Sequence, residues 1–232
     1  MIERPNVELT TRPLHFIWIA DCSGSMHGER INSLNFAIKE ALPAMRDTAK
    51  DNPNAQVLCR AISFESNAKW HIATPTPVDD FNWIDLSTGG VTSMGAALKL
   101  AAKELTIDKM SERALPPVLV LLSDGEPTDD FQQGLDELMA LPWGKKAVRL
   151  SIAIGNDANL DVLQQFIGHN ELQPLVAHNA AELVKFIKWA STQVLKAASS
   201  PESQKVGQAP SNTNVPLAMP PVNNNVAVTD VF

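Results

Sequence analysis

Short apolar runs alternate with helical patterns along this chain, and the alternation predicts a parallel β-sheet covered by helices on both faces. Six runs have the length and the apolar or β-branched content of strands. They lie at residues 14–20, 56–64, 69–74, 117–123, 148–155 and 172–178. The fold class predicted from this order is α/β, with a doubly wound and mostly parallel six-stranded sheet.

The segments between these runs carry apolar residues at helical spacing. The first stripe contains Pro43 and continues beyond it, which favours a kink over a break. Another stripe follows Asn179, a residue type that caps helix N-termini. Shorter helices are predicted at 94–106, 130–140 and 159–167. The first stripe consists of Ile31, Leu34, Ile38, Leu42 and Met45, and the last of Leu183, Phe186, Ile187, Val194 and Leu195.

Domain boundaries follow from a change of composition near the C-terminus. Residues 198–232 hold five of the sixteen prolines and show no sustained helical or strand period. Such a segment buries too little apolar surface to offset its ordering entropy. We therefore predict an N-terminal extension at 1–11, one folded domain at 12–197 and a flexible tail at 198–232.

Charge and composition exclude several classes of function. The net charge of -7, with no local basic cluster, disfavours nucleic acid and anionic lipid as partners. No stretch has the roughly 18 continuous apolar residues of a membrane span, and the N-terminus lacks the pattern of a signal peptide. Cys22 and Cys59 show no zinc-type spacing and are expected to be free thiols. Together these features predict a cytoplasmic protein without a membrane or nucleic-acid role.

Small oxygen-bearing side chains gather where the predicted strands and helices end or begin. The first strand runs into "DCSGS", which places Asp21, Ser23 and Ser25 at alternate positions. Thr92 follows a Gly-Gly turn before a helix, and Asp124 follows the fourth strand. Ligands of an open α/β sheet lie beyond the carboxyl ends of its strands, where strand order reverses. We therefore expect these five residues to converge in one place, here called the oxygen cup.

Hydroxyl and carboxylate oxygens favour a hard divalent cation, with Mg²⁺ expected and Mn²⁺ or Ca²⁺ also suitable. If the neutral hydroxyls contact the metal while the aspartates act mainly through waters, the metal keeps much of its positive charge. It then attracts an acidic group from outside, by several kcal/mol at ~4 Å before desolvation is subtracted. The expected partner is a protein that supplies an aspartate or glutamate.

The motifs "DCSGS", "GGVTSMG" and "LLSDG" resemble the metal-ion-dependent adhesion site of the von Willebrand factor type A domain family, whose pattern is DxSxS, a later Thr and a later Asp. The resemblance spans about residues 12–197 and implies a Rossmann-like fold and a non-enzymatic, metal-dependent binding module. Within that family the chain looks most like the bacterial TerY-like proteins of tellurium resistance and stress response. That likeness implies a scaffold with kinase and phosphatase partners.

Other interpretations compete with the metal site. Thr92 alone is typical of a helix N-cap, and Asp124-Gly125 alone is typical of a turn. Glu126 and Asp129 lie nearby, where an acidic loop is usually solvated. Nucleophile and phosphate-loop motifs are missing, so no catalytic residues are assigned and no enzyme is expected. The remaining alternative is a metal-assisted phosphoester hydrolase with a metal-bound water as its nucleophile.

Overall fold

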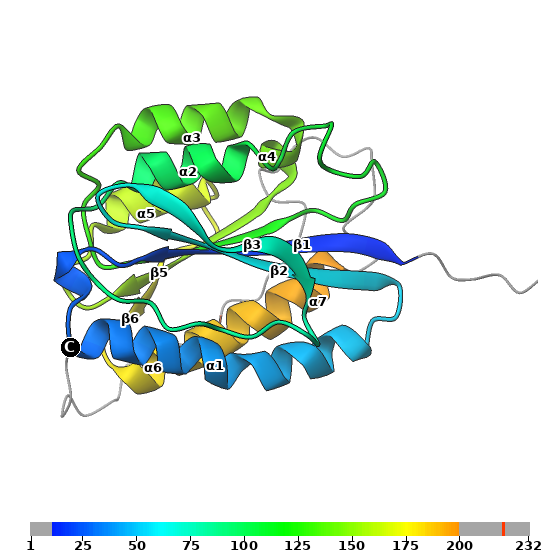
Figure 1. Cartoon of the computed structure of the whole chain (residues 1–232), viewed down its shortest axis with the longest axis horizontal. Coiled ribbons are helices and arrows are strands. Elements are labelled where there is room, and N and C mark those ends of the chain that lie inside the picture. The colour runs from blue at the N-terminus through cyan, green and yellow to red at the C-terminus, as the bar shows by residue number, and fades with distance from the viewer. Residues whose placement is uncertain (1–10, 200–219, 221–232) are drawn as a thin grey trace, which may run out of the picture.

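One mixed sheet organises the protein. A computed structural model describes residues 11–199 and 220, and its six strands have the order β3-β2-β1-β4-β5-β6 (Figure 1). The strands are β1 (Arg12–Asp21), β2 (Ala55–Phe64), β3 (Ala68–Pro77), β4 (Val118–Ser123), β5 (Val148–Ile154) and β6 (Leu175–Ala177). Only the β2–β3 pair is antiparallel among these strands. The predicted α/β, doubly wound, mostly parallel fold is confirmed.

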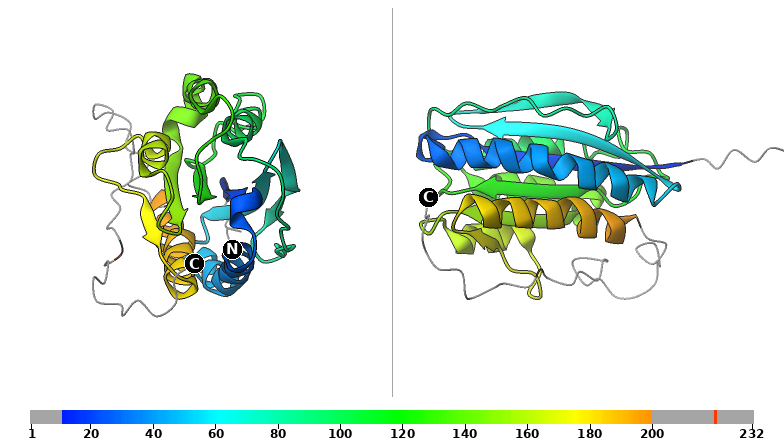
Figure 2. Two further views of the ribbon diagram at one scale, coloured as in Figure 1. Left: turned by 90° about the vertical axis from the view of Figure 1, so that its left-hand side faces the viewer. Right: turned by 90° about the horizontal axis from the view of Figure 1, so that it is seen from below.

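Helices cover both faces of the sheet. One layer holds α1 and α6, which lie side by side, and the other holds α2, α3 and α5 (Figures 1 and 2). A π-helical segment, Ala190–Val194, joins α6 to α7, and a 3₁₀ turn, Gly24–Met26, precedes α1. The helices are α1 (Glu29–Lys50), α2 (Met94–Ala102), α3 (Phe131–Ala140), α4 (Pro142–Lys146), α5 (Leu160–Ile167), α6 (Ala180–Trp189) and α7 (Leu195–Ala198).

The sheet separates two apolar cores. Phe16 and Trp18 of β1 face the α1 side, whereas Ile17 and Ile19 face the α2 side, and all four are buried. This alternation follows from the period of two in a strand. Because both faces are covered, β1 reads as a continuous apolar run, which is why it was recognisable in the sequence.

The two outer strands are irregular or short. β3 carries Pro75 and Pro77, and its pairing with β2 contains register shifts. Proline has no amide hydrogen and is confined to the edges of sheets. At the opposite side of the sheet β6 has only three residues. It is shorter than the predicted 172–178, because Pro174 precedes the paired segment.

The predicted helix features are largely confirmed. Helix α1 runs through Pro43 without a break, and the Asn179 side chain accepts a hydrogen bond from the backbone N–H of Glu182 at the start of α6. Helix α2 ends at Ala102, earlier than the predicted 106. Helix α4 and the π-helical segment were not predicted. Both cysteines are buried free thiols.

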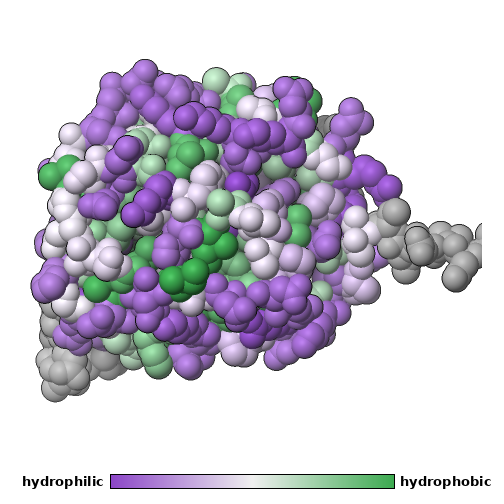
Figure 3. All heavy atoms as spheres, viewed as in Figure 1, coloured by the Kyte–Doolittle hydropathy of each residue, from purple (hydrophilic) through white to green (hydrophobic). Residues whose placement is uncertain are grey.

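A coil without regular secondary structure, residues 78–93, connects β3 to α2. Asn35 of α1 holds this coil. Its side-chain amide donates to the carbonyl of Leu86 at 3.0 Å, while its oxygen accepts from Leu86 N and from Trp83 Nε1, both at 2.9 Å. The face that carries the coil is largely hydrophilic, with hydrophobic areas near its middle (Figure 3).

The predicted extension at 1–11 and tail at 198–232 lie almost entirely outside the described residues. Within the described part of the chain, none of the helices combines the length and apolar content that spanning a membrane requires.

Candidate metal site at the carboxyl edge of the sheet

Strands β1 and β4 bring two of the predicted site residues together. They are parallel neighbours, with Ala20 opposite Leu122 in the register. The chain therefore leaves both strands at the same edge of the sheet, through Asp21 on β1 and Asp124 directly after β4. Strand order reverses between these two strands, so the site lies at the predicted topological switch point.

Asp21 is fully buried at the end of β1. Its Oδ1 accepts a hydrogen bond from Ser23 N at 2.9 Å, and its Oδ2 accepts one from Ser123 Oγ at 2.5 Å. Burial raises the pKa of Asp21 to about 6, although hydrogen bonds from Ser123 and Ser23 oppose this effect. Burial therefore destabilises the ionised form of Asp21 in the metal-free protein, and a nearby cation would stabilise that form.

Ser23, Ser25 and Asp124 form a chain of hydrogen bonds. The two serine hydroxyls lie 3.0 Å apart, and Ser25 Oγ donates to Asp124 Oδ1 at 2.9 Å. The 3₁₀ turn brings Ser25 back toward the strand ends, and Gly24 N donates to Gly90 O at 3.2 Å to hold that turn. The alternate spacing of "DCSGS" thus brings its side chains to one spot, as predicted.

Thr92 reaches the same place from the coil before α2. A Cβ added to Gly125 would lie 3.6 Å from Thr92 Oγ1 and 3.9 Å from Asp21 Oδ2, so both oxygens border one small space beside Gly125. No hydrogen-bond partner of Thr92 Oγ1 occurs among the residues that the structure describes. Gly90 has φ +68, a conformation that favours glycine and turns the coil toward the cup.

Thr92 does not cap α2. The N-cap residue is Ser93, whose side chain makes no capping hydrogen bond. Asp129 provides the cap from a different loop, because its carboxylate accepts from Gly95 N and Ala96 N, both at 2.8 Å. The expectation that Asp129 is merely solvated was therefore wrong. Glu126 is exposed and accepts a hydrogen bond from Asn159.

Arg30, in the first turn of α1, was missed by the sequence reasoning. Its Nη1 lies 2.5 Å from Asp124 Oδ2 and its Nη2 lies 2.7 Å from Asp157 Oδ1. Burial lowers the pKa of Arg30, but the two carboxylates outweigh burial and raise it overall. Asp124 is thus held by Ser25 and by Arg30, one on each oxygen. No local pattern signals this contact, since Arg30 and Asp124 are 94 positions apart.

The donor set suits a hard cation. It consists of three hydroxyls and two carboxylates, and all oxygens of the carboxylates already accept hydrogen bonds from the protein. Within the described ranges no three His, Cys, Asp or Glu residues come close enough to form a metal cluster of their own. The hydroxyl of Thr92 and the space beside Gly125 therefore fit an oxygen-liganded divalent ion rather than a nitrogen- or sulfur-liganded one.

Comparison with known proteins identifies relatives of this fold. The family model described as "von Willebrand factor type A domain" matches residues 17–188. A von Willebrand factor type A protein from Catenulispora acidiphila is 19% identical, with a TM-score of 0.59, over 79% of this chain and 43% of that chain. The pilus adhesin SpaC from Lactobacillus rhamnosus GG is 13% identical, with a TM-score of 0.64, over 81% and 31%.

A third similar structure is proximal thread matrix protein 1 from the mussel byssus, described with a zinc-occupied MIDAS motif. It is 15% identical, with a TM-score of 0.61, over 80% of this chain and 48% of that chain. This chain spans less than half of each of the three solved chains. None of the curated proteins that were compared matches the sequence.

Proposed function

This chain belongs to the von Willebrand factor type A domain family, and on that basis we propose that it is a metal-dependent protein-binding module rather than an enzyme. The observation that carries the proposal is the free hydroxyl of Thr92, which borders the same space as Asp21 while both aspartates are held by protein donors. The proposed metal ligands, direct or through water, are Asp21, Ser23, Ser25, Thr92 and Asp124.

The hydrogen bonds assign different roles to these residues. Both oxygens of Asp21 and of Asp124 accept hydrogen bonds, so the hydroxyls are the groups best placed for direct contact with a cation. Arg30 offsets one negative charge at the cup. A bound divalent cation would supply an open coordination position for an acidic side chain of a partner protein. Because few negative charges contact it directly, that position would stay attractive to a carboxylate.

Mg²⁺ is the proposed ion, because hydroxyl and water ligands suit it. Mn²⁺ and Ca²⁺ remain open for the same donor set. The zinc-occupied motif of the mussel protein supports divalent-metal binding by this fold, without fixing the ion for this chain.

The finer assignment made from the sequence motifs stays a prediction. It places the chain among bacterial TerY-like proteins, as a cytoplasmic scaffold of tellurium resistance or stress response with a kinase and a phosphatase as partners. Its support is the likeness of "HFIWIADCSGSM" and "GGVTSMGAALKLA" to that group.

The competing hydrolase function needs a general base, and within the described part of the chain both carboxylates of the cup are already engaged by protein donors. The ionisable side chain that donates into the cup is Arg30, which stays protonated and so does not accept a proton. His27, the histidine nearest in sequence to "DCSGS", contacts Thr88 instead. We therefore expect no turnover of phosphoester substrates with any of these metals.

Calorimetry on purified protein tests the metal site directly. Wild type is expected to bind one Mg²⁺ per chain, and Asp21→Ala to abolish that binding. Gly125→Ala keeps every ligand but places a methyl group beside Thr92 Oγ1 and Asp21 Oδ2, so it should weaken binding by at least tenfold. Glu126→Gln, one position further along the same loop, is the matched control and should bind like wild type.

Equal Mg²⁺ binding by wild type and Asp21→Ala would contradict the proposal. The partner is identified by capture from bacterial lysate with Mg²⁺ and with chelator, using Asp21→Ala as the blank. Support requires a protein whose capture needs the metal, Asp21 and one of its own carboxylates. Metal-dependent phosphoester turnover that Asp124→Ala removes would instead favour the hydrolase.

A further inference from the structure

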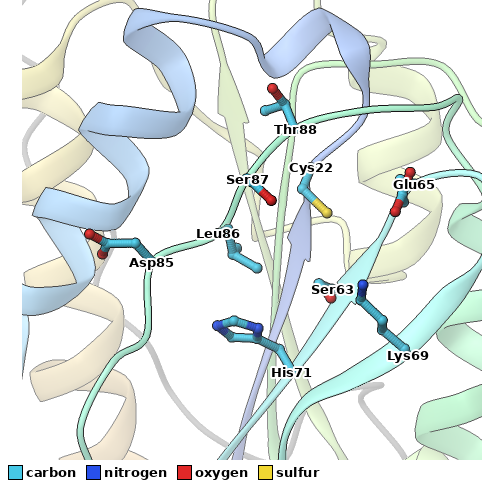
Figure 4. A pocket seen from close by; sticks show the side chains of 9 residues that line it. All are labelled: Cys22, Ser63, Glu65, Lys69, His71, Asp85, Leu86, Ser87 and Thr88. Atoms are coloured by element: carbon cyan, nitrogen blue, oxygen red, sulfur yellow. The ribbon is translucent and has the colours of Figure 1, made fainter.

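A second polar pocket lies next to the oxygen cup, at the same edge of the sheet. Its volume is about 120 Å³, and it opens between the β2–β3 hairpin and the coil before α2 (Figure 4). The coil leaves this opening because no helix covers the sheet there. The lining residues are Cys22, Ser63, Glu65, Lys69, His71, Asp85, Leu86, Ser87 and Thr88.

Two hydrogen-bond donors meet in this pocket. Ser63 of β2 and Lys69 of β3 are directly opposite in the antiparallel register, so their side chains share one face of the sheet. Ser63 Oγ is buried and has no hydrogen-bond partner among the described residues. Lys69 is exposed, and no carboxylate of the described residues pairs with its ammonium. In Figure 4 the Lys69 ammonium is drawn beside Ser63, on the same side of the hairpin. An unpaired ammonium beside an unsatisfied hydroxyl is a site for a hydrogen-bonding anion.

The acidic residues of the pocket are directed elsewhere. Asp85 pairs with Lys39 of α1 at 2.5 Å and points away from Ser63 and Lys69 (Figure 4). The carboxylate of Glu65 lies against the glycine turn, where Oε2 would be 2.7 Å from a Cβ on Gly90. Neither carboxylate therefore neutralises the ammonium, although both make the pocket less attractive to a highly charged anion than to a single carboxylate.

The remaining side chains leave the Ser63–Lys69 pair free. His71 Nε2 contacts Ile84 O at 2.7 Å. The Cys22 thiol donates to Phe64 O, and burial raises the pKa of Cys22 to about 11, so this thiol stays protonated. The pocket therefore offers donors for binding and no activated nucleophile.

The volume of the pocket limits the size of the group that it can bind. Sites for free small molecules are mostly apolar and measure about 300–1,000 Å³. This pocket is polar and holds the equivalent of about four waters at roughly 30 Å³ each, which suits one carboxylate-bearing side chain.

The pocket and the oxygen cup share the same two backbone segments, the end of β1 and the coil before α2. Cys22 lies between Asp21 and Ser23, and its carbonyl accepts a hydrogen bond from Gly89 N at 2.9 Å. The coil that forms one wall continues directly to Thr92. A partner surface that covers the cup therefore also meets the pocket.

We propose that this pocket binds a second acidic side chain of the partner segment whose first carboxylate approaches the metal site. Lys69 and Ser63 hold the second carboxylate, so the protein recognises a pair of acidic residues rather than one. This inference rests on the proposed metal-dependent function.

Synthetic peptides in a Gly-Ser background test it. One peptide carries a single glutamate, and four others carry two glutamates separated by one to four residues. With Mg²⁺ present, at least one two-glutamate peptide should bind at least tenfold tighter than the single-glutamate peptide, with amide NMR shifts at Ser63 and Lys69. In Lys69→Gln and in Ser63→Ala the two-glutamate peptide should bind no more than twofold tighter than the single-glutamate peptide. The Mg²⁺ affinity of both variants, measured by calorimetry, should stay unchanged. Lys103→Gln, at an exposed position directly after α2, is the control and should keep the tenfold preference for the two-glutamate peptide.

The inference would be overturned if, with Mg²⁺ bound to the protein, all five peptides bind equally or none binds. It would also be overturned if the advantage of the two-glutamate peptide survives Lys69→Gln. Sodium acetate, titrated into metal-free protein against sodium chloride of equal ionic strength, separates the two proposals. Acetate shifts at Ser63 and Lys69 that disappear in Lys69→Gln support the pocket even if Mg²⁺ does not bind, and their absence counts against it. Loss of Mg²⁺ dependence in peptide binding, by contrast, overturns the proposed metal function.

Discussion

Replacing Asp21 by asparagine is expected to stabilise the metal-free protein at neutral pH. Burial raises the pKa of Asp21 to about 6, against 3.8 for an aspartate exposed to water. The folded state then binds this proton more tightly than the unfolded state does. Its stability therefore falls as the pH rises from 3.8 through 6, and above that the cost stays at about 3 kcal/mol. An asparagine amide at this position would be comparable to the protonated carboxyl and would avoid this cost.

Urea unfolding in the presence of chelator measures the effect. At pH 7.5, Asp21→Asn should exceed wild type in unfolding free energy by about 3 kcal/mol, and at pH 4.5 by about 1 kcal/mol. With a denaturant slope of about 2 kcal/mol per M, the difference at pH 7.5 corresponds to a midpoint shift of about 1.5 M. Saturating Mg²⁺ should stabilise wild type at pH 7.5 and leave Asp21→Asn unchanged.

Asp108→Asn, at an exposed position, is the control and should stay within about 0.5 kcal/mol of wild type at both pH values. A difference between wild type and Asp21→Asn that is the same at pH 4.5 and pH 7.5 would refute the reasoning, because the cost would then not come from ionisation of the buried carboxyl.

Two further substitutions test the surroundings of the site. Asn35→Ala should lower the unfolding free energy by about 2–4 kcal/mol, because it leaves the buried polar groups of Trp83 and Leu86 without partners, whereas exposed Asn32→Ala should change it little. Urea unfolding gives the value, and a loss below about 0.5 kcal/mol would mean that the coil does not depend on this clamp. Arg30→Gln should tighten Mg²⁺ binding by about tenfold in calorimetry, more at low salt, because it removes a cation beside the metal. Weaker binding would show that positioning of Asp124 by the guanidinium matters more than its charge.

The fold could be predicted for those elements whose pattern of apolar residues follows directly from the faces that they bury. Strands β1, β4 and β5 are covered on both faces and appear as apolar runs, and α1 shows its stripe on either side of Pro43. Helix α4 has only five residues, too few for a helical period to emerge. The burial of Arg149 in β5 was also not predictable from the local sequence, because a charged residue is usually exposed. Its guanidinium donates to backbone carbonyls of α4 and α5, which are contacts that no local pattern indicates.

The convergence of the oxygen cup was predictable because parallel strands place their carboxyl ends at one edge. The supporting contacts were not. Arg30 reaches Asp124, Asp129 caps α2, and Ser123 donates to Asp21. Each of these contacts joins segments at least 33 positions apart, and each depends on the relative placement of loops that no local pattern specifies.

The irregular edges of the sheet restrict how a partner can approach. An outer strand with free backbone groups invites another chain to add a strand to it. On β3, Pro75 and Pro77 remove two amide donors, and the register shifts interrupt the ladder. On β6 only three residues are available for pairing. Strand addition is thus disfavoured on both sides, which protects the domain from edge-to-edge aggregation and directs recognition to side chains at the carboxyl edge instead of to the backbone.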